Sequence, residues 1–319
     1  MWYLPALRPA RAMRLGLQAA QKRIALDYHA ENPGGDRRDQ SHVLSGVCAA
    51  CIGGNVCGGG KAMPLIYEPT GKAREYSPLA LNLYTSCDHA CDYCFVPMIR
   101  RSAPGCRDVN VRKDGLKLLA RELAKGAPQQ QILMSFMSDP YNHLDVDMKL
   151  TREGLKILNA AGALVAILTK GGLRALRDLD VFKTFGPRIK VGATLTFSTA
   201  AAARSAEIEP FAAPPAERLE MLRVLHEAGV RTWASLEPVI DPAESLRIME
   251  ESLPFVDAYK IGKMNHFEKR YGAVDWGVFL RESVGVMRRA GKPFYIKEDL
   301  RKFQGDVILN PEECDSDFL

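Results

Sequence analysis

The chain has 319 residues, of which 47% are hydrophobic and 25% are charged, and its formal net charge at pH 7 is +5. This composition excludes an intrinsically disordered chain and supplies enough apolar residues for one large domain with an appendage. The longest apolar run, residues 160–168, is about half of the roughly 18 residues needed to cross a bilayer, so we expect no membrane partner. The modest charge permits a nucleic acid partner without requiring one, since a solvated basic surface explains it equally well.

The eight cysteines are interpreted as metal-binding or reactive thiols. The N-terminus lacks the apolar core and the small-residue cleavage site of a secretory signal peptide. We therefore expect a cytoplasmic protein, in a compartment where disulfides are rare.

The N-terminal quarter divides into two regions by composition. Residues 1–40 form a basic arm, and residues 41–76 form a segment rich in cysteine and glycine. Cys48, Cys51 and Cys57 lie in this segment, in CAACIGGNVC. Because the segment has little hydrophobic periodicity, a bound metal is expected to supply its folding energy. The residues leave open a second iron–sulfur cluster, a zinc ion or free thiols.

A fourth ligand for this second site is not determined by the spacing. Cys106 and Cys314 are the two candidates, and both lie far along the chain from the glycine-rich segment.

From residue 77 to residue 303, short apolar runs alternate with amphipathic helical patterns. The runs predict strands within 79–84, 131–136, 164–170, 189–197, 231–240, 257–263 and 293–298, and the patterns between them predict helices within 111–126, 151–162, 217–229, 244–253 and 276–290. Strands that alternate with helices pair in parallel through right-handed crossovers, so we predict an α/β fold, a partial (β/α)6 barrel. Residues 304–319 are expected to form a C-terminal tail. Chemistry in such barrels takes place at the carboxyl ends of the strands.

Three cysteines, Cys87, Cys91 and Cys94, follow the first predicted strand in the stretch LYTSCDHACDYCFVPM. A random scatter of eight cysteines would give this spacing with a probability of about 0.005. Zinc is the main alternative, but a zinc ribbon needs a second C-x-x-C pair about 15 to 20 residues away, whereas Cys51 and Cys91 are 40 apart. Three thiolates can instead hold three irons of a [4Fe-4S] cluster and leave the fourth iron open to another ligand.

The pattern C-x-x-x-C-x-aromatic-C, with Tyr93 at the aromatic position, resembles the signature of the radical S-adenosylmethionine (SAM) superfamily. This resemblance implies that the open iron binds SAM. It also implies that an electron from the reduced cluster, supplied by an external donor such as flavodoxin or ferredoxin, cleaves SAM to methionine and a 5′-deoxyadenosyl radical.

Further segments resemble the spore photoproduct lyase branch of that superfamily, which includes relatives described as DNA repair photolyases. They are MSDPYN at 137–142, ILTKGGLRALRDLDVF at 167–182, IEP at 208–210 and LEPVID at 236–241, and the likeness extends from residue 78 to about 300. The resemblance implies that Ser138, Lys170 and either Thr194 or Thr196 bind SAM.

Each of these side chains also has an ordinary structural interpretation. Ser138 could belong to a simple turn, and Lys170 could be a solvated residue at the end of a strand. Arg218 is a further candidate for cofactor binding, with a charge on a helix surface as the alternative. Glu237, which precedes a proline, is as compatible with a structural role as with a functional one.

The leading hypothesis for the substrate is a DNA or RNA base. The branch supports it, and so do six basic residues beside the cysteine triplet, Arg100, Arg101, Arg107, Arg112, Lys113 and Lys117, which could contact phosphates. The alternatives are modification of a peptide or small molecule, and a non-catalytic, zinc-bound nucleic-acid adaptor.

Two positions depart from the lyase pattern. The resemblance places a hydrogen-donating cysteine and a radical-relaying tyrosine at positions where this chain has Phe136 and Phe95. A phenyl ring cannot donate that hydrogen atom, and no pattern places Cys106 inside the barrel. We therefore predict that the protein is not a true spore photoproduct lyase.

Overall fold

A computed structural model of the chain describes residues 64–100 and 107–317, which fall within one compact unit, Cys57–Leu319. The basic arm and the thiols of Cys48, Cys51, Cys57 and Cys106 lie outside the described residues, so the second metal site remains a prediction.

The core of the described unit is one sheet whose strands are ordered along the chain. Its members are β1 (Ile66–Tyr67), β2 (Leu79–Leu81), β3 (Ile132–Met134), β4 (Val165–Thr169), β5 (Ile189–Thr194), β6 (Arg231–Leu236), β7 (Ala258–Ile261) and β8 (Phe294–Ile296). β1 pairs antiparallel with β2, and every later neighbour pairs in parallel. No pairing joins β8 to β1 among the described residues, so the sheet is an open, partial barrel. This confirms the predicted fold, with β8 as a seventh parallel strand.

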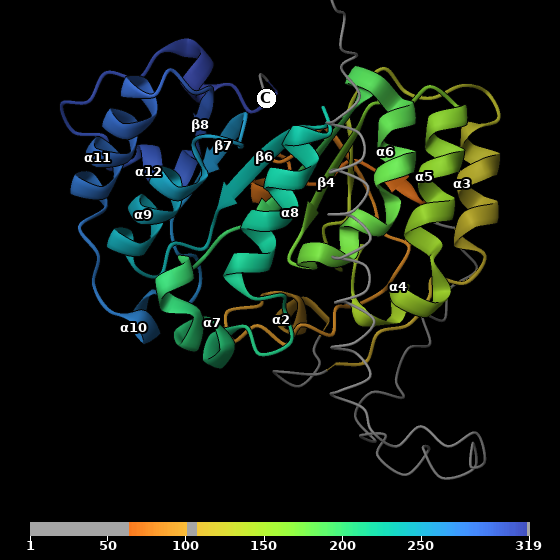
Figure 1. Ribbon diagram of the computed structural model, residues 1–319, viewed down its shortest axis with the longest axis horizontal. Helices are drawn as coiled ribbons and strands as arrows, with labels where there is room; N and C mark the ends of the chain where they lie inside the picture. The colour runs from red at the N-terminus through yellow and green to blue at the C-terminus, as the bar shows by residue number, and fades with distance from the viewer. Residues whose placement is uncertain (1–63, 101–106, 318–319) are drawn as a thin grey trace, which may run out of the picture. The chain divides into compact units, whose positions relative to one another are not determined.

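Helices follow most of the parallel strands. The longer ones are α3 (Gly115–Leu123), α5 (Leu150–Ala160), α6 (Leu179–Phe185), α7 (Ala202–Ile208), α8 (Pro215–Glu227), α9 (Pro242–Ser252) and α11 (Trp276–Arg289). The shorter ones are α2 (Val96–Arg100), α4 (His143–Met148), α10 (Glu268–Tyr271) and α12 (Glu298–Arg301), together with the 3-10 helices η2 (Gly71–Ala73), η3 (Gly172–Asp178), η4 (Gly186–Arg188), η5 (Thr199–Ala201) and η6 (Pro311–Cys314). In Figure 1, α3, α5 and α6 lie side by side outside the sheet, and α9 packs near α11.

The helices begin and pack as their sequences dictate. α9 and α11 begin at the N-cap residues Asp241 and Asp275, whose carboxylates accept backbone N–H groups of the first turn. α5 buries Thr151, Leu155 and Leu158, which lie on one face at helical spacing and turn that face toward the sheet.

A buried cluster around Trp233 fills part of the barrel interior. Trp233 of β6 packs in a buried cluster with Ala80 and Leu133, and its indole nitrogen donates to the carbonyl of Ile167 at 2.9 Å. Gly192 of β5 makes room for this ring, because a Cβ there would lie 2.5 Å from the indole nitrogen. The barrel is therefore closely packed around Trp233.

Two segments close the unpaired side of the barrel near β8. The buried Nζ of Lys260 donates to the backbone carbonyls of Glu75 at 2.6 Å, Tyr76 at 3.2 Å and Ser316 at 2.9 Å. Asp317 in the tail accepts from Arg74. The segment before β2 and the C-terminal tail are thus both tied to the barrel. No helix in the described part of the chain is long and apolar enough to cross a membrane.

Candidate active site

The three clustered cysteines lie in the loop that follows β2. The backbone N–H of Cys94 donates to the carbonyl of Cys91 at 3.0 Å, and the N–H of Asp92 donates to the carbonyl of Ile208 at 2.9 Å, so the loop is bonded to the last residue of α7. All three thiols are free and partly buried.

The surroundings of these thiols favour the neutral, protonated form of each thiol. Burial raises the pKa of Cys91 to about 12, and it raises the pKa of Cys87 and of Cys94 as well. Thiolates at such positions need a positive charge beside them, which a metal centre supplies. Three sulfur ligands in one loop fit a [4Fe-4S] cluster with one open iron, and the ligand assignment itself stays a prediction.

Asp139 connects the loops that follow β2, β3 and β4. Its carboxylate accepts the hydroxyl of Thr169 at 2.6 Å and the backbone N–H of Lys170 at 2.7 Å. The same carboxylate lies 3.6 Å from Nδ1 of the buried His89, which stands between Cys87 and Cys91 in the sequence. The loop carrying the cysteines and the loop carrying Lys170 are therefore held at a fixed separation.

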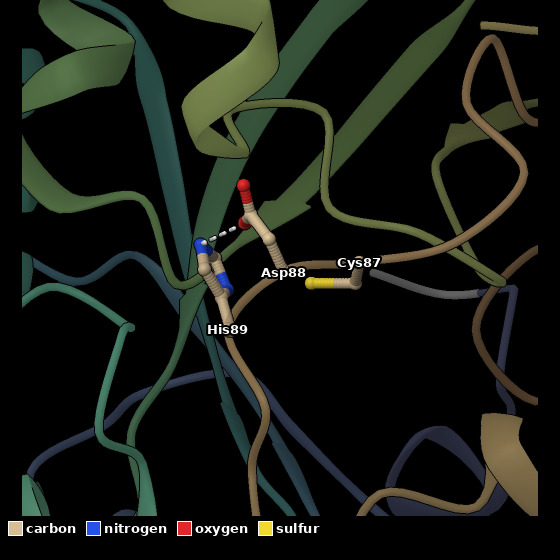
Figure 2. Close-up of side chains that lie close together, drawn as sticks. All are labelled: Cys87, Asp88 and His89. Atoms are coloured by element: carbon tan, nitrogen blue, oxygen red, sulfur yellow. Dashed lines mark ion pairs between the residues drawn. The ribbon is translucent and has the colours of Figure 1, made fainter. Parts of the chain in front are cut away.

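Cys87, Asp88 and His89 also place a possible ligand atom each within 4.8 Å of the others. In Figure 2, the dashed line joins only Asp88 and His89, and the Cys87 side chain is not part of that pair. His89 Nε2 lies 3.0 Å from the guanidinium of Arg174, which can only donate, so this nitrogen already accepts a hydrogen bond. Burial and Arg174 lower the pKa of His89 well below its usual value. We interpret His89 as a buried support of the loop rather than as a metal ligand.

A second buried group of charges lies directly beside Cys91. Arg218 of α8 and Glu209, which follows α7, form an ion pair of 2.5 Å, and both side chains are at most 1% exposed. Burial would raise the pKa of Glu209, but Arg218 and Lys170 outweigh it and hold this pKa at about 2. The Tyr93 hydroxyl donates to Glu209 and lies 3.2 Å from the Thr196 hydroxyl.

Lys170 extends from the end of β4 over the ring of Tyr93, with its Nζ 5.3 Å from the ring centroid. Burial lowers the pKa of Lys170, but Cys91 and Glu209 more than offset this effect, so the pKa is raised overall. The ammonium group is therefore charged and lies close to the cysteine loop, where it could meet an anionic ligand group.

The remaining predicted SAM ligands lie at the same end of the barrel. The Ser138 hydroxyl donates to the carbonyl of Ser86 in the cysteine loop, and its lone pairs can still accept. Thr196 donates to Glu209 at 3.0 Å, whereas the Thr194 carbonyl accepts from Arg218 at 3.1 Å. These positions are compatible with the predicted roles, which stay predictions.

Arg218 differs from one of its sequence-based interpretations. It is not a charge on a helix surface, because its side chain is 1% exposed and donates to Ala213, Thr194 and Glu209. Glu209 itself was missed as a site residue, although it lies within the IEP segment. Nothing in the local pattern distinguishes a loop glutamate that pairs with a buried arginine from one that faces water.

A third polar group lies at the ends of β6, β7 and β8. Glu237 accepts the hydroxyl of Tyr76 at 2.5 Å, the amide of Asn265 at 2.7 Å and the ammonium of Lys297. Lys297 also lies 3.5 Å from Glu75. The sequence left the role of Glu237 open and gave no signal for its partners.

The basic residues near the cysteines differ in their surroundings. Arg107 stacks on Phe211, with its guanidinium 3.4 Å from the ring centroid, and donates to the Asp88 carbonyl at 3.1 Å. Lys117 is 84% exposed and pairs with Asp114, while Arg112 donates to the Pro64 carbonyl. Arg100 and Lys113 are exposed, and Arg101 lies outside the described residues.

Cys314, the other candidate ligand for a second metal, lines a cavity of about 510 Å³ with Glu75 and Tyr295.

Comparison with protein families gives one match, to the radical SAM superfamily, over residues 81–256. An uncharacterized protein of Methanocaldococcus jannaschii is 34% identical over 191 residues, which are 58% of this chain and 70% of the relative. An uncharacterized protein of Acidianus two-tailed virus is 28% identical over 59% of this chain and 65% of its own length. An uncharacterized protein of Mycobacterium tuberculosis is 25% identical, and there the match covers half of this chain and 49% of the relative.

Solved structures with a similar fold contain different bound molecules. A spore photoproduct lyase complexed with dinucleoside spore photoproduct has a TM-score of 0.53 and 16% identity, over 72% of this chain and 79% of its own. Streptococcus suis SuiB bound to the precursor peptide SuiA has a TM-score of 0.53 and 13% identity, over 74% of this chain and 53% of its own. At such low identity, these likenesses establish the fold alone.

Proposed function

The chain belongs to the radical SAM superfamily, and we propose that it is an enzyme that cleaves SAM reductively at a [4Fe-4S] cluster in order to modify a nucleic acid base. The observation that carries the proposal is the placement of three free thiols in one loop, directly beside a buried network of Lys170, Glu209 and Arg218. When bound, the cluster supplies the electron that splits SAM into methionine and the 5′-deoxyadenosyl radical.

We assign the side chains of this network complementary tasks. Cys87, Cys91 and Cys94 hold iron. Lys170 binds the SAM carboxylate through its charged ammonium, which suits a carboxylate acceptor. The hydroxyls of Ser138 and Thr196 face the same end of the barrel and bind polar groups of SAM, with Thr194 as the alternative to Thr196.

Arg218 acts through Glu209 in this proposal. Its donors are engaged by protein acceptors, and the resulting ion pair fixes the carboxylate that orients Tyr93 and Thr196. A one-electron donor such as flavodoxin or ferredoxin is expected to reduce the cluster from outside the chain.

For the substrate, a DNA or RNA base is favoured by the exposed basic residues near the cysteine loop. Arg100 and Lys113 are available to phosphates, whereas Arg107 supports the loop itself. Peptide modification is the second candidate, since the fold likeness to a peptide-bound enzyme is as strong as the likeness to the lyase. A non-catalytic zinc adaptor has no support from the superfamily match.

The cleavage step is tested with anaerobically purified protein, reductant and SAM, and 5′-deoxyadenosine release is the readout. We expect Lys170→Ala and Ser138→Ala to weaken SAM binding by tenfold or more without loss of iron, because these residues touch SAM and not the metal. Lys156→Ala, on the exposed face of α5, is the matched control. Loss of iron in the first two variants would indicate structural roles instead.

The substrate class is tested with oligonucleotides. If exposed basic residues bind phosphates, affinity should fall steeply between 50 and 200 mM salt, with a slope set by the number of phosphates contacted. Binding that does not change over this range would favour the peptide interpretation.

A further inference from the structure

Two aromatic rings separate the cysteine loop from the polar group at the ends of β6 to β8. Phe95 directly follows Cys94, and Phe136 follows β3. Their ring centroids lie 5.7 Å apart at an interplanar angle of 44°, and both residues are partly exposed. The backbone N–H of Phe136 donates to Asn82 at 2.9 Å, which fixes its position. The functional roles proposed above use neither ring.

Tyr76 joins this aromatic pair to Glu237. Its ring centroid lies 5.9 Å from that of Phe136, and its hydroxyl donates to Glu237 Oε2 at 2.5 Å. A partly exposed aromatic surface and a carboxylate therefore lie within one tyrosine side chain of each other, at the end of the barrel where the cysteines lie.

The position of Glu237 is built into the fold. Gly262, at the end of β7, would place a Cβ 2.9 Å from the Glu237 carboxyl carbon and 3.1 Å from Lys297 Cδ. Only glycine leaves both charged side chains in place there. Within the described part of the chain, Glu237 Oε1 accepts one hydrogen bond, from Asn265 at 2.7 Å, so a lone pair remains for a further donor. The side chain of Glu237 is 14% exposed.

We propose that Phe95, Phe136 and Glu237 form a nucleobase subsite, in which the base stacks on the phenyl rings and an N–H group of its edge donates to the carboxylate. The inference rests on the proposed function and names the residues that would receive its substrate. Every base has a flat π-face and stacks on aromatic side chains, and ring or exocyclic N–H groups are the natural partners of a carboxylate.

The test separates binding of bases from binding of phosphates. The probe is a fluorescein-labelled thymidine hexamer, and its matched control is a hexamer of the same charge with abasic sites in place of the bases. Binding is measured by anisotropy with the anaerobic full chain loaded with iron. We expect wild type to prefer the base-bearing probe by about tenfold, within the range of stacking energies for single bases.

Single-residue variants show which side chains cause the preference for the base-bearing probe. Phe136→Leu and Phe95→Leu should bring the ratio of the two affinities close to one while affinity for the abasic probe stays unchanged, and Glu237→Gln should reduce the ratio by a smaller factor. Phe303→Leu, at an exposed phenylalanine after α12, should retain the preference. Iron content is measured on each preparation, because Phe95→Leu can disturb the neighbouring Cys94. If Phe95→Leu has lost iron, the conclusion is drawn from Phe136→Leu alone.

Three outcomes would overturn the proposal. Wild type could bind both probes equally, or Phe136→Leu could weaken both by the same factor, which would assign the rings a structural role only. Displacement of the probe by random octapeptides from wild type but not from Phe136→Leu would assign the rings to a peptide. Release of 5′-deoxyadenosine, measured in the same samples, keeps the two proposals apart: cleavage without base preference removes the subsite alone, and absence of cleavage with full iron removes the proposed function.

Discussion

At the carboxyl ends of β2 to β5, buried charged groups tie several loops together, whereas at the ends of β6 to β8 the buried Lys297 pairs with a carboxylate, Glu237, whose side chain is 14% exposed. In the first half, Asp139 ties three loops together and Glu209 pairs with Arg218 away from water. In the second half, Glu237 keeps some exposure and shares Lys297 with Glu75. The first half therefore buries its ion pair completely, and the second half leaves one carboxylate partly open to water.

The strongest test of this division removes the thiols. In Cys87→Ala/Cys91→Ala/Cys94→Ala, we expect loss of about four irons and of all SAM cleavage, because three ligands of one cluster disappear. Glu237→Gln, in the other half, should keep its iron. Iron analysis and the visible absorption of the purified proteins decide the matter, and an unchanged iron content in the triple variant, or zinc in its place, would reject the cluster.

The aromatic pair that follows β2 and β3 gives the second test. Phe95 and Phe136 are in contact there, and neither can return a hydrogen atom to a thymine radical. With DNA containing spore photoproduct, SAM and reductant, we expect no multiple-turnover conversion to intact thymines, as measured by chromatography of the digested DNA. Conversion that persists in Cys106→Ala would show that the missing thiol is not needed and would contradict this expectation.

A smaller effect is expected from removing one buried charge in each half. Glu209→Gln leaves Arg218 without its counter-ion and should lower the free energy of unfolding by about 3–5 kcal/mol. Glu237→Gln should cost less, because Glu75 remains near Lys297. Urea denaturation measures the free energy of unfolding of both variants. Equal losses of stability would mean that the buried charge contributes equally in the two halves.

The smallest effect concerns the barrel interior beneath both halves. Burial lowers the pKa of Lys190 to about 7, and its Nζ has no hydrogen-bond partner among the described residues. Between pH 7 and about 10 the unfolded chain keeps this proton while the folded chain loses it, so folding stability rises with pH. Lys190→Met should abolish this rise and add about 2 kcal/mol at pH 7.

Urea denaturation at pH 7 and pH 9 measures both effects of Lys190→Met. Lys117→Met, at an exposed lysine, is the control and should change neither value. A loss of stability at pH 7 in Lys190→Met would mean that the buried ammonium has a favourable partner.

The sequence predicted the strands well because each is a compact apolar run, and β4 to β7 lie within the expected ranges. It also identified the cysteine triplet, since the spacing of three rare residues is informative by itself. Ser138 and Lys170 were selected only through the family resemblance, and their roles are still to be tested.

The partners of the other site residues had no local signal. Glu209 and Arg218 pair across the segment between two helices. A buried ion pair of this kind produces no periodic pattern that could be recognised in the sequence. Tyr76 was grouped with the cysteine-rich segment because it precedes the first apolar run. In the structure its ring packs against Trp233 inside the barrel, through contacts that join residues more than 150 positions apart.

The hydrogen bonds of Lys260 have a consequence for how the protein is made. This one ammonium group joins the backbone before β2 to the backbone at Ser316, across separations of 185 and 56 residues. Contacts between such distant residues form late, because closing a long loop costs conformational entropy. This cost falls once shorter-range structure has brought the two segments close together. While the chain emerges from the ribosome, the thiol loop and β2 to β5 can assemble first, but the backbone of Glu75 and Tyr76 gains its bonds to Lys260 only after β7 has been synthesised. The three cysteines proposed to hold iron would then be in place before Tyr76 and Glu237 come together.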